Sequence, residues 1–273
     1  MIRLLKADLY RVLRSKLTLI ALLLAVGFPI LTVLLYSGLK LIGGIAEDPA
    51  LGSLFSANTI IGTVYSLSNN VGLVVPAFAG ILVCLDYSNG TLRNKVIAGN
   101  RRSQIYLSHL TVSILFSVVI ISVYALLMAG LALIFFPFTV DPAVDLGLEI
   151  FWFIMNGTLT FAFMATVSTL FAMIFRSTAP TIIFTIVFSI ALYALTSVLM
   201  AIDLGNFKYA AYFIPTFSGN FFSLSSFGAL GMFGQTAEAS KWLMFAEGTA
   251  SFFFFGAVNT VIGLYFFKKR DIR

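Results

Sequence analysis

The chain has 273 residues, of which 60% are hydrophobic and only 10% are charged. A soluble domain of this size would carry about 25% charged residues, so the composition excludes an ordinary soluble enzyme or binding module. The formal net charge of +6 could indicate a nucleic-acid partner, but the basic residues lie beside long apolar runs, so we assign them to membrane topology and expect no nucleic acid.

The first predicted element is an amphipathic helix over residues 1–16. Its apolar residues recur at helical spacing, which predicts a helix in the inner membrane interface with basic side chains near anionic lipid headgroups. The charges could also serve only to orient the first span. The residues that we assign to this interfacial helix are Leu5, Leu9, Arg11, Val12 and Arg14.

Charge-free runs of about twenty residues predict six transmembrane helices, and so an all-α membrane protein. The first apolar run is longer than the core of a signal peptide, and we therefore expect it to be retained. Residues 1–273 form a single transmembrane domain in this interpretation. The predicted spans cover about Leu17–Tyr36, Tyr65–Leu85, Ile105–Phe136, Ile150–Phe175, Thr181–Ile202 and Gly248–Phe267.

Residues 205–245 include a long aromatic stretch without charges, from Tyr209 to Ala237. A seventh span here would place the C-terminal basic residues outside the cell, against the bias of basic residues toward the cytoplasm. Its glycines also weaken a continuous helix. We therefore expect short re-entrant or extracellular helices between spans five and six.

The distribution of charge predicts the orientation of the spans. With six spans, one face holds residues 1–16, 86–104, 176–180 and 268–273, and these carry 14 of the 17 basic residues but only 3 of the 11 acids. Basic residues are enriched in cytoplasmic loops, so both termini are expected in the cytoplasm.

The predicted cytoplasmic loop, residues 86–104, has the pattern of a short helix between two turns. Thr91 is expected to cap a helix that runs to Ala98, and Gly99-Asn100 would end it. Leu92, Val96 and Ile97 would give this helix an apolar face for docking into a groove of a partner protein. A solvated basic loop that serves only topology is the alternative.

Three segments of the chain resemble the permease subunit of an ABC transporter of the type-2 exporter class. They are the amphipathic helix Leu4–Lys16, the loop with Asp86, Gly90-Thr91-Leu92 and a turn from Gly99 to Ser103, and the basic tail Phe266–Arg273. Two departures are visible. The acid of this pattern is more usually Glu than the Asp86 found here, and His109 stands where a basic residue often begins the third span.

The resemblance implies that the loop forms a coupling helix seated in a cleft of a separate ATPase. The residues that it assigns to coupling are Asp86, Gly90, Thr91, Leu92, Arg93, Val96 and Arg101. The chain has no phosphate-loop motif, so we expect it to be no enzyme and to bind no cofactor, with ATP and Mg held by the ATPase. The resemblance also implies a second permease copy or a related permease, and it favours export over import; we expect a bacterial plasma membrane. The aromatic outer segment and the uncharged span interiors favour an amphipathic or apolar cargo such as a peptide, lipid or drug.

Polar residues inside the spans leave several interpretations open. Asn156, Thr160 and Asn259 are candidates for a substrate path, although helix packing is the default explanation. His109 is expected to be a headgroup-level or neutral hydrogen-bonded histidine. Cys84 is expected to be a small buried hydrophobe, and one cysteine with one histidine cannot build a typical zinc site. The alternatives to a permease are a gradient-driven secondary transporter or channel and a membrane-anchored assembly protein.

Overall fold

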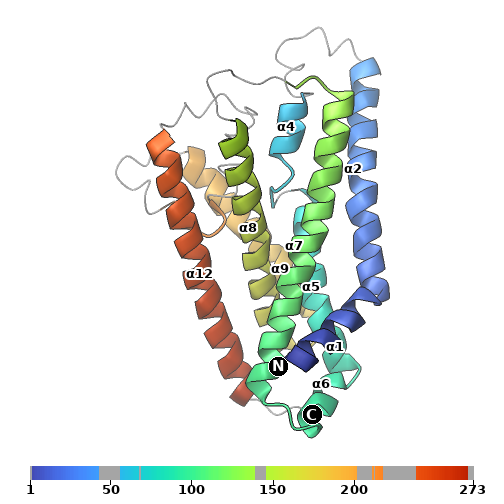
Figure 1. Cartoon of the computed structure of the whole chain (residues 1–273), viewed down its shortest axis with the longest axis vertical. Coiled ribbons are helices and arrows are strands. Elements are labelled where there is room, and N and C mark those ends of the chain that lie inside the picture. Colours follow the sequence, from blue (N-terminus) through green and yellow to red (C-terminus); the bar gives the residue numbers. More distant parts are fainter. Residues whose placement is uncertain are drawn as a thin grey trace.

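The computed structural model is a bundle of long helices that run roughly along one axis (Figure 1). It describes residues 2–42, 56–67, 69–138, 146–201, 211, 213–217 and 238–269. Six of the described helices are long and apolar enough to cross a membrane, which confirms the predicted number of spans. These six are α2 (Lys16–Ile42), α5 (Asn70–Ser88), α7 (Arg102–Phe135), α8 (Leu146–Phe175), α9 (Thr178–Ala201) and α12 (Glu238–Lys269).

The last span begins earlier than its apolar run predicts. α12 starts at Glu238, whereas the prediction began at Gly248. The extra turns pack aromatic rings on α8, with Trp242 in edge contact with Trp152 at 5.3 Å between ring centroids. Aromatic contact therefore extends α12 beyond its most apolar part. Most of the re-entrant segment predicted within 205–245 lies outside the described residues.

A short buried helix precedes the second span, and the sequence did not predict it. Ser56 is the N-cap residue of this helix, α4 (Ala57–Gly62), and its hydroxyl accepts a hydrogen bond from the Thr59 backbone N–H at 3.3 Å. The chain then turns, and the next helix, α5, begins at Asn70. The second span therefore starts five residues later than the predicted start at Tyr65. Gly72 allows this tight turn, because a Cβ there would collide with the Ser66 carbonyl oxygen.

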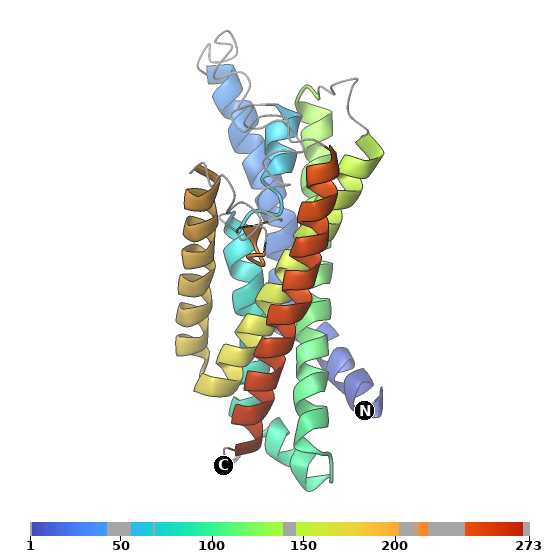
Figure 2. The same cartoon turned by 90° about the vertical axis from the view of Figure 1, so that its left-hand side faces the viewer.

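α8 is the central helix of the bundle, and α5, α7, α9 and α12 pack around it. In Figure 2, α8 (yellow) runs obliquely behind α12 (red), with which it shares its most extensive contact. α2, α9 and α12 instead turn large apolar side chains outward, as helices that face lipid do.

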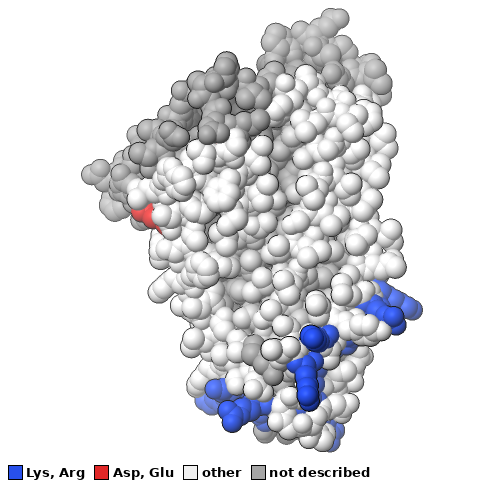
Figure 3. All heavy atoms as spheres, viewed as in Figure 1, with Lys and Arg blue, Asp and Glu red and all other residues white. Residues whose placement is uncertain are grey.

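Two further helices lie at the end of the bundle where α12 finishes. α1 (Ile2–Leu13) crosses the starts of α2 and α7, and α6 (Thr91–Ile97) connects α5 to α7 (Figure 1). Lysine and arginine side chains gather at this end and lie beside α1, α6 and the last turn of α12 (Figure 3). We call it the basic end of the bundle.

Candidate functional site

The loop at the basic end contains the predicted short helix. α6 spans Thr91–Ile97 and is followed by Gly99, whose φ of 82° lies in the left-handed region that favours glycine. Gly90, with φ 66°, precedes the helix. The predicted cap was wrong in detail: Thr91 makes no cap, and its hydroxyl donates a hydrogen bond to the Asp86 carbonyl oxygen at 3.1 Å.

The apolar face of α6 points into the protein, which corrects the expected docking face. Leu92 is 1% exposed and belongs to a buried cluster with Tyr106 and Phe267, and Val96 packs against the same cluster. These side chains therefore fasten α6 to the bundle. Ile97, by contrast, is 73% exposed, and Arg93 and Asn94 lie on the open side of the helix.

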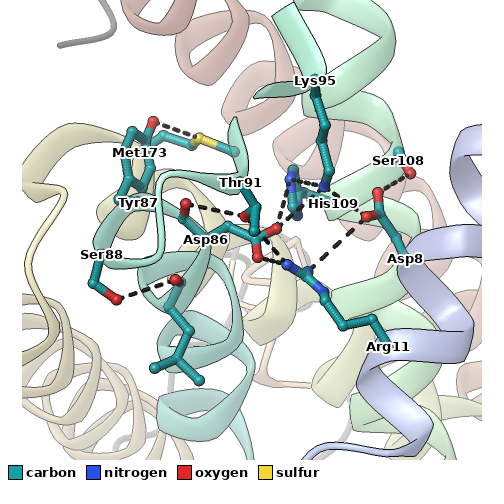
Figure 4. Close-up of polar contacts among 11 residues, drawn as sticks. Asp8, Arg11, Asp86, Tyr87, Ser88, Thr91, Lys95, Ser108, His109 and Met173 are labelled. Atoms are coloured by element: carbon teal, nitrogen blue, oxygen red, sulfur yellow. Dashed lines mark hydrogen bonds and ion pairs between the residues drawn. The ribbon is translucent and has the colours of Figure 1, made fainter. Parts of the chain in front are cut away.

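A group of polar side chains joins α6 to three other helices (Figure 4). At its centre is Lys95, which neither the loop pattern nor the resemblance singled out. Its ammonium donates hydrogen bonds to Asp8 Oδ1 at 2.6 Å and Asp86 Oδ2 at 3.2 Å, and lies 3.2 Å from His109 Nε2. We call Asp8, Arg11, Asp86, Lys95, Ser108 and His109 the Lys95 cluster.

Arg11 of α1 supplies the second positive charge of the cluster. Its guanidinium forms an ion pair with Asp86 Oδ1, lies 4.0 Å from Asp8 and donates a hydrogen bond to Thr91 Oγ1 at 3.4 Å. Ser108 of α7 donates to Asp8 Oδ2 at 2.7 Å. Both carboxylates are buried, so they require these partners to offset the loss of water.

His109 completes the cluster from α7 and is almost fully buried. Its Nε2 lies 3.2 Å from both Lys95 Nζ and Asp86 Oδ2, yet a single ring nitrogen cannot accept from one and donate to the other. If Nε2 accepts a hydrogen bond from Lys95, His109 is uncharged. The two carboxylates of the cluster are then balanced by its two cations, Arg11 and Lys95, and the cluster has no net charge. We therefore assign His109 as a neutral acceptor, because an imidazolium would add a third buried cation beside Lys95.

The surroundings shift the pKa values of three members of the Lys95 cluster that lie outside the spans. Burial alone would raise the pKa of the Asp8 carboxyl, but the hydrogen bonds from Lys95 and Ser108, together with the electrostatic interactions with His109 and Lys95, outweigh it and hold the pKa below its ordinary value. Burial lowers the pKa of the Lys95 ammonium, although its bond to Asp8 opposes this shift. Burial likewise lowers the pKa of Arg11.

The apolar side of α1 was predicted to face lipid, but the middle of this side packs against the protein. Val12 is buried with Asp8, and Leu5 packs against the core, while Leu9 is half-buried. The buried Asp8 explains this arrangement, because its partners lie on α6 and α7. Ile2 and Leu13 remain exposed, and Arg14 lies over the Tyr10 ring at 4.8 Å.

The other predicted site residues belong either to the coupling loop or to the candidate substrate path. Arg93 and Arg101 are exposed at the basic end and lie outside the Lys95 cluster. Asn156 and Thr160 are buried on α8, where each donates a hydrogen bond to a carbonyl oxygen four residues earlier. Asn259 donates from α12 to Thr166 Oγ1 of α8 at 3.3 Å, so it joins two helices.

Sequence reasoning missed Asp8, Lys95 and Ser108 as members of the site. One signal was present, because Asp8 is the only acid among the sixteen N-terminal residues. A single acid on a basic helix indicates that its carboxylate contacts a specific side chain, but the sequence does not show which side chain this is. Cys84 is buried as expected, and its thiol lies 3.3 Å from Thr181 Oγ1. Within the described ranges, no three His, Cys, Asp or Glu side chains could together hold a metal ion.

A six-span bundle with a helix docked across one end and a short helical loop beside it defines a multi-pass membrane protein. The family model for ABC-2 family transporter proteins matches residues 4–192, from α1 into α9 and over more than half of the chain. The chain therefore belongs to the ABC-2 family and is a permease subunit of an ABC transporter. None of the curated proteins matches it.

Proposed function

We propose that the chain is the transmembrane subunit of an ATP-driven exporter. It forms the path for an amphipathic or apolar cargo, such as a peptide, lipid or drug, and works with a separate ABC ATPase that binds ATP and Mg. Two copies of the chain, or one copy and a related permease, complete the pore. The basic end faces the cytoplasm of a bacterial cell, because positively charged segments are retained on that side.

One observation carries the coupling to an ATPase: α6 is held firmly on its inner side and open on its outer side. Leu92 and the Lys95 cluster fix the helix to the bundle, so a force applied to α6 would reach the spans. Arg93, Asn94 and Ile97 remain exposed. A large apolar side chain exposed beside an arginine is typical of a protein-binding surface.

Co-purification with the ATPase tests this proposal. We expect the double variant Arg93→Ala/Ile97→Ala to reduce recovery of the ATPase at least tenfold, as the loss of central interface residues does. Ile2→Ala/Arg3→Ala is a matched control, because Ile2 and Ile97 are 72% and 73% exposed. Equal recovery with both variants would refute docking through α6. The purified chain alone should not hydrolyse ATP.

A gradient-driven transporter is the second candidate, and the break between α4 and α5 favours it. Discontinuous helices inside a bundle often line ion and substrate sites in such transporters. Uptake of a fluorescent amphiphilic dye into inside-out vesicles separates the two. Transport by the proposed exporter requires ATP and the ATPase, whereas gradient-driven uptake would continue without the ATPase and stop with a protonophore.

A further inference from the structure

Lys95 occupies a position where one side chain connects four helices. An ammonium has three N–H donors, and the three acceptors around Lys95 come from three other elements: Asp8 from α1, Asp86 from α5 and His109 from α7 (Figure 4). The side chain is 15% exposed, so little water competes for these donors. The geometry uses the full bonding capacity of the ammonium.

The contact between α1 and α6 depends on these side chains. Among the described helices, the backbone of α1 packs mainly on α7 and α2, and that of α6 on α5 and α7. The bonds that reach directly from α1 to α6 are those from Lys95 to Asp8 and from Arg11 to Thr91. The first of them is the shorter and joins two opposite charges, so it is the stronger.

α1 is joined to the first span by a short and well-bonded connection. Only two residues separate the end of α1 at Leu13 from the start of α2 at Lys16. Ser15 Oγ accepts a hydrogen bond from the Thr18 backbone at 3.1 Å, and Thr18 Oγ1 donates back to the Val12 carbonyl oxygen. This double bridge fixes the angle between the helices, so a movement of α1 would carry the base of α2 with it.

We propose that Lys95 is a positioning residue that links α6 to the first span through Asp8, α1 and the Ser15–Thr18 bridge. The inference rests on the proposed function, since the ATPase supplies the displacement of α6. The loop itself transmits movement along the chain to α5 and α7. Lys95 adds a second route, by which α2 moves together with them.

Distance measurement between spin labels tests this link. We label Leu34→Cys on α2 and Leu126→Cys on α7, which are 63% and 76% exposed, in a Cys84→Ser background. The full-length chain is purified with the ATPase that accompanies it and reconstituted, and the label distance is compared without nucleotide and after trapping with ATP and vanadate. We expect Lys95→Met to reduce the nucleotide-dependent change in distance to less than half, with ATPase binding and hydrolysis retained.

Lys6→Met is the matched control, because Lys6 is an exposed lysine on α1 and should preserve the full change. If Lys95→Met does not fold, Asp8→Asn removes the charged acceptor while Lys95 keeps its contact with Asp86. A full change in distance with either variant would overturn the link. So would a wild-type complex that hydrolyses ATP without any change in distance. If no ATPase accompanies the wild-type chain, the proposed function fails and this inference fails with it.

Discussion

At the scale of single residues, the Lys95 cluster shows why burial of charge need not signal stability. A buried ion pair returns little net free energy, because both charges lose their water, but removing one partner is costly since the other charge is left alone. Asp8 is 2% exposed and Asp86 is fully buried, so both depend on Arg11 and Lys95. The cluster therefore fixes geometry more than it raises stability.

A double-mutant cycle on Asp8 and Lys95 tests this interdependence. Asp8→Asn and Lys95→Met should each lower the free energy of unfolding by about 3 kcal/mol, because each leaves a buried charge unmatched. The double variant should cost about 2 kcal/mol less than the sum of the two. The measurement is denaturant titration in detergent micelles. Lys6→Met should change the value by less than about 0.5 kcal/mol, and strict additivity would contradict the contact.

The lowered pKa of Asp8 predicts an acid-dependent loss of stability. A carboxyl whose folded pKa lies below its ordinary value of 3.8 stabilises the fold fully above that value. The contribution is lost as the pH falls through the folded pKa, because the carboxylate is then protonated in both states. The stability difference between wild type and Asp8→Asn should thus be constant from neutral pH to about 5 and shrink below about 4. Thermal unfolding across this range measures it, and a difference that grows on acidification would contradict the assignment.

At the scale of elements, close contacts at glycines fix how the spans meet. A Cβ at Gly157 of α8 would overlap the Tyr65 ring, and Tyr65 also stacks edge-on against Phe153 at 4.9 Å between ring centroids. Tyr65 lies in the turn between α4 and α5. The missing side chain on α8 therefore makes room for the turn that breaks the second span.

Gly157→Val should destabilise the protein by about 2 kcal/mol, because the added atoms overpack a filled site. Tyr65→Ala in the same chain should recover part of this loss by emptying the space. Unfolding in detergent measures both effects. Gly130→Ala on α7 provides the control, since a Cβ there meets nothing within 4 Å, and it should be neutral or slightly stabilising. Equal effects of the two glycine substitutions would contradict the close contact.

At the scale of the whole molecule, charge separates the two ends of the bundle. Exposed basic residues at one end come from α1, from α6 with the turn that follows it, and from the end of α12, three regions that are far apart in the sequence (Figure 3). The spans bring them together because an even number of crossings returns the chain to the side where it started. This common location is the physical basis for placing the basic end in the cytoplasm.

Labelling of single cysteines on intact cells tests the orientation. In a Cys84→Ser background, Asn94→Cys on α6 should resist an impermeant maleimide, whereas Gly147→Cys at the opposite end of α8 should react. Both positions are exposed, so access to the reagent and not burial decides the result. Permeabilised membranes that have been washed free of the proposed ATPase, which would cover position 94, should label both positions. Reaction at position 94 on intact cells would reverse the topology.

The sequence by itself determined the class of the protein, the number of spans and the position of the α6 helix. These features follow from composition, from runs without charge and from turn residues such as Gly90 and Gly99, all of which act locally along the chain. Orientation is likewise a prediction from charge alone. The expected family was confirmed by the match over residues 4–192.

Only the tertiary structure decided which side of α6 is buried, where α1 docks and which charges meet. Leu92 and Ile97 are equally apolar in the sequence, yet one lies in the core and the other is open, because the neighbouring helices cover a single face. Asp8 and Lys95 are 87 positions apart, and their pairing depends on how α1 and α6 are carried to the same end of the bundle. Local pattern carries no information about such distant contacts, since they arise from packing between helices.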